Sequence, residues 1–361
     1  MSLSRRTMLA GMMASGLGLT ACSPSDPTVH ASADADAGTA PSDAPPALPT
    51  LDRTIATGLA VPWSLAFLAD GAALVSERES GRVLRVDGGG SVDEVGVVPG
   101  VAARGEGGLL GLALSPDESA LYAYLSSDAD NRLVRMPFDG GLGTPEVLVE
   151  GIALARNHQG GRLRFGPDGM LYVTVGDAAD GSRAQDPGDL AGKILRLDAD
   201  GRAAEGNPFG TRVWSLGHRN PQGLAWDGDR MWAAELGQDA ADELNRIEPG
   251  GNHGWPEVEG AGGAPAYVDP VVTWPTSACS PSALEIHRGV AYLCALRGQG
   301  LWVVPLAGDG AGTPQKAFDG ELGRLRCVAA APDGSLWLTT SNRDANGTPG
   351  VDDDRILRVV V

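Results

Sequence analysis

The sequence predicts an all-β protein, a six-bladed β-propeller of four-stranded antiparallel blades, on three observations. Glycine and proline contribute 52 and 25 of the 361 residues, which disfavours a helical bundle and favours short strands joined by turns. One pattern, an apolar strand, a Pro-Asp-Gly-like turn and a second apolar strand, occurs six times. Equivalent positions in successive copies lie 47, 51, 61, 60 and 44 residues apart, which is the spacing of propeller blades.

Each copy supplies the inner strands of one blade, and most copies continue into a third strand such as RVLRVD, KILRLD or RILRVVV. The chain ends after the third strand of the last copy, so we expect residues 53–57 to add its outer strand and close the ring. The alternative is a set of unrelated β-hairpins in two sandwich domains. The copies start at Ser64, Gly111, Arg162, Gly223, Ala283 and Cys327.

The N-terminal residues 1–21 have the features of an export signal. SRRTML at 4–9 resembles a twin-arginine signal, and LTAC at 19–22 resembles a bacterial lipobox, in which Cys22 is lipidated and becomes the new N-terminus. The alternative is an ordinary cleaved signal with an accidental cysteine. We expect an exported, periplasmic or cell-surface lipoprotein tethered to a bacterial membrane.

Residues 22–50 are predicted to form a lipidated, disordered tether, because 25 of the 28 residues from 23 to 50 are Ala, Pro, Ser, Thr, Asp or Gly. Residues 51–361 form the predicted propeller and catalytic domain. Beyond the signal no apolar run reaches the ~18 residues that a spanning helix needs.

The charge of the chain excludes several partners. Without residues 1–21 the chain carries 26 Lys and Arg against 46 Asp and Glu, a formal net charge of −20. Such a surface repels nucleic acid and anionic membranes, so we expect no nucleic-acid partner and membrane contact only through the lipid anchor. Cys279, Cys294 and Cys327 remain in the body, and the sequence leaves open one disulfide among them or buried free thiols.

Four segments contain more polar residues and glycines than blades require: 104–111, 157–162, 217–223 and 235–238. Loops that lead into the inner strands of a propeller meet at one mouth of the central channel, where ligands bind. The chain lacks Gly-x-Ser-x-Gly, Cys-x-x-Cys and His-Glu-x-x-His, and the glycines of segment 104–111 miss the dinucleotide and phosphate-loop spacings. Nucleotide-binding, serine-hydrolase and zinc-protease functions therefore lack support.

From about residue 58 to residue 359 the chain resembles the soluble aldose sugar dehydrogenases that depend on pyrroloquinoline quinone (PQQ). This family of six-bladed propellers includes soluble glucose dehydrogenase. The resemblance rests on the order of several motifs: GEGGLLGLALSPD, NHQGGRLRFGPDGMLYVTVGD, AGKILRLDADG, WSLGHRNPQGLAWD, DELNRIEPGGNHGWP and LRGQGLWVVPL.

The resemblance implies catalytic roles for three residues. His158 is the implied general base for the C1 hydroxyl of the sugar, and imidazole is the side chain most often used for such a proton transfer. Asp177 is the implied partner that orients this imidazole. Arg219 and Asn220 match the Arg-Asn pair beside the reactive quinone carbonyl, where the guanidinium stabilises negative charge.

The resemblance also implies residues that bind the carboxylates of PQQ and a residue that contacts the sugar. Arg324 and Arg326, two residues apart on a strand, face the same side and resemble carboxylate-binding arginines. Arg297 stands where the family commonly has lysine. Glu106 stands where the family usually has glutamine near the bound sugar. Its negative charge beside His158 is expected to make the activity require a higher pH than it would with glutamine.

Calcium is the implied metal, with oxygen ligands. The carbonyls of Gly237 and Gln238 match a cofactor-calcium loop that usually reads Gly-Pro, and Glu243 with the carbonyl of His253 suggests a structural calcium. The acidic run 352–354 has no family counterpart and is expected to be a solvated loop.

The resemblance implies PQQ-dependent oxidation of aldose sugars to lactones, with electrons passed to an external acceptor such as a quinone or cytochrome. Two alternatives stay open at this point. One is a calcium-dependent lactonase-type hydrolase, which the HRNPQG segment fits poorly. The other is a non-enzymatic ligand-binding propeller.

Overall fold

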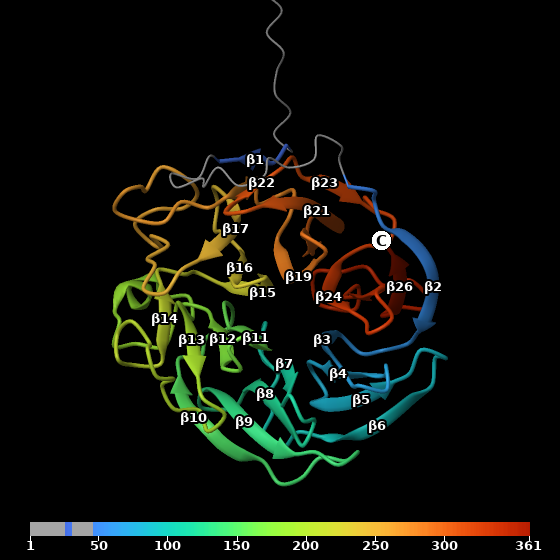
Figure 1. Ribbon diagram of the computed structural model, residues 1–361. Coiled ribbons are helices and arrows are strands. Elements are labelled where there is room, and N and C mark those ends of the chain that lie inside the picture. Colours follow the sequence, from blue (N-terminus) through green and yellow to red (C-terminus); the bar gives the residue numbers. More distant parts are fainter. Residues whose placement is uncertain (1–25, 31–45) are drawn as a thin grey trace, which may run out of the picture.

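Six antiparallel sheets surround a central axis in the computed structural model, which describes residues 26–30 and 46–361 (Figure 1). This arrangement confirms the predicted six-bladed propeller. The described residues contain no α-helix and one short 3-10 helix, η1 (Gly181–Gln185).

The blades follow the chain in order, and each predicted repeat forms one of them. The first three blades contain the strands β3 (Pro62–Phe67), β4 (Ala73–Glu77), β5 (Arg82–Val86), β6 (Val92–Val97), β7 (Leu109–Leu114), β8 (Ala120–Ser126), β9 (Asn131–Pro137), β10 (Glu146–Ile152), β11 (Gly160–Phe165), β12 (Leu171–Val175), β13 (Lys193–Leu197) and β14 (Val213–Leu216). The last three contain β15 (Pro221–Asp227), β16 (Arg230–Glu235), β17 (Asp242–Ile247), β18 (Val272–Trp274), β19 (Pro281–His287), β20 (Val290–Ala295), β21 (Gly300–Ala307), β22 (Gly310–Ala311), β23 (Gln315–Ala317), β24 (Leu325–Ala330), β25 (Leu336–Thr340) and β26 (Ile356–Val360).

An N-terminal strand closes the ring, as the sequence predicts. β2 (Thr50–Ala56) pairs antiparallel with β26, with Thr54 opposite Leu357 and Ala56 opposite Ile356. The last blade therefore joins the two ends of the described propeller, and β2 removes the free edge that β26 would otherwise expose.

A short strand lies within the predicted tether. β1 (Thr28–Val29) pairs with β18, with Thr28 opposite Thr273, and His30 Nε2 lies 2.8 Å from the hydroxyl of Thr273. The expectation that all of 22–50 is unstructured is therefore wrong for this segment, because backbone pairing to an open sheet edge needs little apolar surface. Cys22 and the export signal lie outside the described residues.

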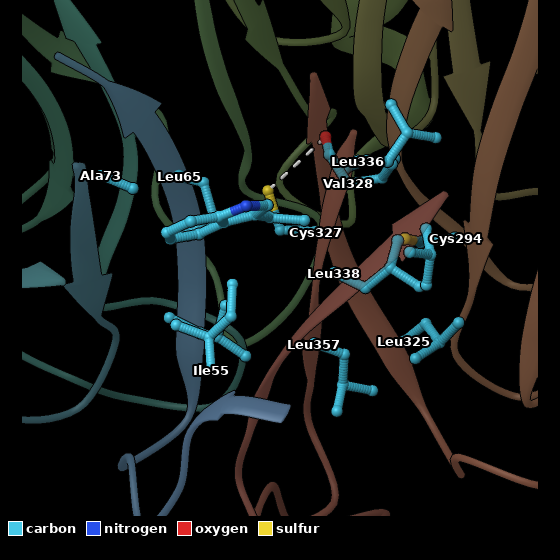
Figure 2. Close-up of a cluster of buried hydrophobic side chains, with 14 of the residues drawn as sticks. Ile55, Leu65, Ala73, Cys294, Leu325, Cys327, Val328, Leu336, Leu338 and Leu357 are labelled. Carbon is cyan, nitrogen blue, oxygen red and sulfur yellow. Dashed lines mark hydrogen bonds between the residues drawn. The ribbon is translucent and has the colours of Figure 1, made fainter. Parts of the chain in front are cut away.

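Apolar clusters hold neighbouring blades together, and Figure 2 shows the one at the ring closure. It joins Ile55 of β2, Leu65 of β3, Leu338 of β25 and Leu357 of β26, and Leu338 and Leu357 are fully buried. Successive side chains of a strand point to opposite faces, so Ala73 and Val75 of β4 belong to this cluster while Leu74 packs in another. Burial of apolar surface therefore contributes directly to closing the ring.

The first strands of the blades, β3, β7, β11, β15, β19 and β24, contact one another in sequence around the axis (Figure 1). They form the wall of the central channel. The loops that precede them consequently converge at the same end of the channel.

Two sequence-based expectations about the body are settled by burial. Cys279, Cys294 and Cys327 are buried free thiols, so the disulfide alternative is wrong. The expected solvated loop at 352–354 is also wrong, because Asp353 and Asp354 are buried. The backbone and side-chain amides of Asn342 donate hydrogen bonds to the carboxylates of Asp354 and Asp353, and these bonds compensate the burial.

In the part of the chain that the structure describes, no helix has the length and apolar character needed to cross a membrane.

Candidate active site

A cavity of about 840 Å³ occupies one end of the central channel. All four polar segments singled out in the sequence contribute to its wall, through Glu106, Gln159, Gln222 and Leu236 among others. The first three segments run from loops into the channel strands β7, β11 and β15, and the fourth begins at the end of β16, so the convergence expected of a propeller is confirmed.

Positive charge dominates the wall of this cavity. Five arginines line it, against the two carboxylates of Glu106 and Asp344. Such a cavity attracts an anion, although the chain as a whole is acidic. The five are Arg78, Arg156, Arg297, Arg324 and Arg326.

Arg324 and Arg326 share one partner, Asp344. The nearest nitrogens of the two guanidinium groups lie 3.1 Å and 3.5 Å from Asp344 Oδ2. Burial alone would raise the pKa of Asp344, but the charges of Arg326 and Arg324 outweigh it and hold this pKa below its ordinary value. Arg326 also donates to Gln222 Oε1 at 2.9 Å, and its Nε is buried with no hydrogen-bond partner among the described residues.

Arg297 differs from this pair. Its side chain lines the cavity, its residue is exposed, and no carboxylate of the described chain pairs with it. It is therefore a cation that a bound anion can reach without displacing a protein partner.

His158 and Asp177 form a buried pair directly behind the cavity wall. His158 Nδ1 lies 2.7 Å from Asp177 Oδ1, and the two residues are 8% and 1% exposed. Asp177 Oδ1 also accepts the backbone N–H of Ala179 at 2.8 Å. With the Nδ1 proton donated to Asp177 Oδ1, Nε2 has no partner among the described residues and can accept a proton.

Close backbone approach sets the position of His158. A Cβ added to Gly176 would lie 2.0 Å from the carbonyl oxygen of His158, so only glycine fits there. On the other side, Glu106 Oε2 accepts the backbone N–H of His158 at 2.8 Å. Glu106 thus lies beside His158, as the resemblance implies, but its hydrogen bond is to the backbone and not to the imidazole.

Arg219 and Asn220 adjoin this pair without lining the main cavity. The carbonyl of Arg219 accepts the N–H of Asp177 at 2.8 Å, and Asn220 Oδ1 accepts the N–H of Gly160 at 3.0 Å. Asn220 Nδ2 is buried and has no hydrogen-bond partner in the described chain. An unused buried donor of this kind carries a free-energy cost that a ligand acceptor would remove.

A buried network holds the backbone of Arg219. Glu235 accepts the backbone N–H of Arg219 through Oε1 and binds His218 Nδ1 through Oε2 at 2.8 Å, while His218 Nε2 lies 2.8 Å from the hydroxyl of Ser215. Burial lowers the pKa of His218 to about 3, so its ring is neutral. This serine, histidine and glutamate have the contacts of a hydrolytic triad, but all three are buried away from the cavity and serve to fix the loop.

Comparison with known proteins places these features in a family. Residues 59–351 match the glucose/sorbosone dehydrogenase family. The chain belongs to this family. The PQQ-bound form of an aldose sugar dehydrogenase from Streptomyces coelicolor is a similar structure, with 49% identity and a TM-score of 0.85 over 88% of this chain and 99% of that chain.

Two curated relatives agree with this assignment. An aldose sugar dehydrogenase of Escherichia coli is 29% identical over 322 residues, which cover 77% of this chain and 86% of that protein. Quinoprotein glucose dehydrogenase B of Acinetobacter calcoaceticus is 33% identical over 251 residues, or 58% of this chain, and the match spans only 52% of that relative.

Three of the four residues predicted to bind calcium come together in this member of the family. Gly237, Glu243 and His253 line one small void of about 10 Å³, whereas the neighbouring Gln238 is exposed. Burial, followed by the nearby charge of Glu235, raises the pKa of Glu243. The void thus joins what the sequence treated as two separate sites.

Side-chain ligands alone do not make a metal site here. Within residues 26–30 and 46–361, no three His, Cys, Asp or Glu side chains are grouped so that they could hold a metal ion. A calcium site in this protein therefore needs backbone carbonyls in addition to Glu243.

Sequence reasoning missed Asp344, Gln222 and Trp255 as residues of the site. Gln222 and Trp255 lie within the motifs HRNPQG and NHGWP, so the resemblance had already marked their segments. Asp344 follows β25 in a loop with no recognised motif. The only indication in the sequence was the pair Arg324 and Arg326, because two neighbouring arginines in a buried site need a carboxylate partner.

Proposed function

We propose that this protein is a PQQ-dependent dehydrogenase that oxidises the C1 hydroxyl of aldose sugars and produces lactones. The observation that carries the proposal is the His158–Asp177 pair, held directly behind an arginine-lined cavity. Family membership and the 49% identity to a PQQ-bound aldose sugar dehydrogenase support the same function.

The residues of the cavity fit a planar tricarboxylate. Arg297 has no carboxylate partner in the described chain, and Arg324 and Arg326 share a single one. Arg326 Nε and Asn220 Nδ2 are buried donors that have no hydrogen-bond partner among the described residues. Arg297, Arg324 and Arg326 would hold the carboxylates of PQQ. The neighbouring Arg219 and Asn220 would supply hydrogen-bond donors to its quinone carbonyl. When bound, PQQ supplies an electron acceptor that takes up a hydride equivalent.

The chain's own residues would handle the proton. Oxidation at C1 removes the hydroxyl proton together with the C1 hydrogen and its electron pair. His158 Nε2 accepts the proton, because Nδ1 is committed to Asp177. Asp177 holds the ring in this orientation and stabilises the imidazolium that forms. Arg219 places a fixed positive charge beside the site, where negative charge develops.

Calcium is proposed at the void lined by Gly237, Glu243 and His253. The carbonyls of Gln238 and His253 accept no hydrogen bond from the described residues, so both are available as ligands. The carbonyl of Gly237 accepts a bond from Arg219 Nη1 at 2.7 Å, which connects this region to the catalytic loop. The buried carboxylate of Glu243 would supply the charged ligand.

The electrons leave through an external acceptor such as a membrane quinone or a cytochrome. Export and a lipid on Cys22 would place the propeller at a bacterial membrane surface. The cavity is wide, so we expect a broad range of aldoses.

The test reconstitutes the purified protein with PQQ and Ca²⁺ and follows dye reduction with a panel of hexoses, pentoses and disaccharides. We expect activity that needs PQQ and is lost in His158→Ala. Hydrolysis of lactones with calcium and no PQQ would instead identify a lactonase. Absence of PQQ binding would leave a non-enzymatic ligand-binding propeller, and a strong preference for one sugar over its epimers would contradict the expected breadth.

A further inference from the structure

Trp255 contacts both Asp177 and Arg219 of the candidate site. Its indole N–H donates to Asp177 Oδ2 at 2.8 Å, and its ring lies under the guanidinium of Arg219, 5.5 Å from the ring centroid. We propose that Trp255 is a positioning residue that holds Asp177, and through it His158, in the geometry that proton removal requires. This inference rests on the proposed function of His158.

The contacts of Asp177 give Trp255 a distinct role. Asp177 Oδ1 is shared by His158 Nδ1 at 2.7 Å and the backbone N–H of Ala179 at 2.8 Å. Oδ2 has one hydrogen-bond partner among the described residues, the indole of Trp255. Asp177 is 1% exposed, so water cannot readily replace that donor. Loss of the indole N–H would leave Oδ2 buried without a donor, and the carboxylate of Asp177 would be freer to rotate about its Cβ–Cγ bond.

Trp255 is itself held firmly on both sides. Its backbone N–H donates a hydrogen bond to the carbonyl of Gly217 at 3.0 Å, and its backbone carbonyl accepts a hydrogen bond from Gln185 Nε2 at 2.7 Å. A Cβ added to Gly181 would lie 3.1 Å from the indole nitrogen, so the chain packs closely around the ring. The ring therefore presents its N–H from a fixed position.

The bond spans 78 residues of sequence. Asp177 follows β12 in the third blade, and Trp255 lies in the long connection between β17 and β18 of the fourth. The connection thus reaches back over the preceding blade and contributes a donor to the catalytic pair. A loop of the fourth blade therefore donates a hydrogen bond to the His158–Asp177 pair of the third blade.

Removing the N–H should affect orientation and charge together. A loosened Asp177 holds the imidazole less well, so kcat should fall while KM for the sugar changes little. A carboxylate that has lost a donor carries more unneutralised negative charge, which favours the imidazolium. The acidic limb of the pH–rate curve should therefore move to higher pH.

The test compares Trp255→Phe, which keeps an aromatic ring, with Trp302→Phe as a matched control. The indole nitrogen of Trp302 is also buried, but it has no hydrogen-bond partner in the described chain. We expect Trp255→Phe to lower kcat by ~10-fold or more, in the range of outer-shell partners that orient a functional histidine. The control should leave kcat and the pH profile unchanged.

A second readout uses the apoprotein and needs no turnover. Nitrogen-15 NMR of the imidazoles, with the His158 signal identified by its loss in His158→Ala, reports on the Nδ1 proton bound to Asp177. Trp255→Phe should shift this signal, and Trp302→Phe should not. If Trp255→Phe fails to fold, Asp177→Asn in otherwise native protein should move one of the indole N–H signals.

The outcomes separate the two proposals. An unchanged acidic limb and an unmoved His158 signal in folded Trp255→Phe would overturn the positioning role, as would the absence of any indole shift in Asp177→Asn. If His158→Ala retains activity, the proposed function of His158 fails instead, whatever Trp255 does.

Discussion

Glu106 accepts a hydrogen bond from the backbone N–H of His158, with 2.8 Å between Glu106 Oε2 and the His158 nitrogen. Glu106 also lines the main cavity. One residue therefore borders the cavity in which a ligand would bind and also holds the backbone of His158, the proposed base. Its own backbone N–H donates to the carbonyl of Arg156 at 2.9 Å. The loop at Glu106 and the loop at His158 are therefore fastened together at two points.

Glu106→Gln should separate the charge of this residue from its hydrogen bond. The glutamine carbonyl can still accept the N–H of His158, so PQQ binding should be preserved. Removal of a negative charge near the imidazole should move the acidic limb of the pH–rate curve to lower pH and alter the apparent sugar affinity. Steady-state kinetics across pH measures both effects.

Glu106→Ala is the companion variant, because it removes the charge and the acceptor together. It should lower kcat further than Glu106→Gln by loosening the His158 loop. An unchanged affinity together with an unmoved acidic limb in Glu106→Gln would show that this residue is not part of the site.

His158→Ala should abolish most of the dehydrogenase activity while PQQ still binds. General-base catalysis typically contributes ~10²- to 10⁴-fold, so we expect a loss of kcat in that range. His287→Ala is the control, since His287 lies on β19 and does not line the main cavity. Dye-reduction rates and PQQ titration check the two parts, and near-full activity in His158→Ala would rule out the assignment.

Calcium should stabilise the protein through Glu243. A chelator should lower the melting temperature and added Ca²⁺ should restore it, with ~2.7 kcal/mol of stabilisation at 100 times the dissociation constant. Glu243→Gln should remove most of this response. Glu248→Gln should keep it, because the half-exposed Glu248 pairs with Arg246 and does not line the void. An equal response in both variants would argue against a ligand role for Glu243.

Asp344 should make the protein lose stability in acid. Its folded-state pKa lies below the ordinary value of 3.8, because Arg326 and Arg324 outweigh the effect of burial. The unfolded chain then takes up a proton first as the pH falls, so this stability is present above about pH 4 and is lost as the pH falls through the folded-state pKa.

Asp344→Asn should therefore destabilise the protein at pH 7 by about 1–3 kcal/mol, the usual cost of leaving buried charged donors short of a partner. The difference from the native protein should shrink toward pH 3. Urea unfolding at several pH values measures it. A difference that is the same at pH 7 and pH 3 would contradict the role of the Asp344 charge.

Ring closure should depend on the buried face of β2. Ile55 is 8% exposed and belongs to the closing cluster, whereas Leu51 on the same strand is 45% exposed. Ile55→Ala should lower the free energy of unfolding by about 2–4 kcal/mol and Leu51→Ala by less than about 0.5 kcal/mol. Equal effects in denaturant unfolding would mean that β2 does not close the ring through this cluster.

Much of the architecture could be predicted from local sequence. The repeat of apolar strand, turn and apolar strand marks each blade, because alternation with a period of two places one face of a strand against the next sheet. The missing outer strand of the last copy predicted β2, and its pairing with β26 confirms this. The segment at Thr28–Val29 could not be predicted, since its two residues carry no pattern of their own.

The sequence by itself determined the six blades, their closure and the four loops that meet at one mouth, because these follow from periodic burial and from turns between neighbouring strands. Only the tertiary structure decided which side chains meet across blades. The contact of Trp255 with Asp177 and the sharing of Asp344 by Arg324 and Arg326 are such cases. So are the contact of Glu106 with a backbone N–H and the burial of Asp353 and Asp354. Such pairings depend on how the closed ring orients its loops, and that orientation is set by packing among all six blades together.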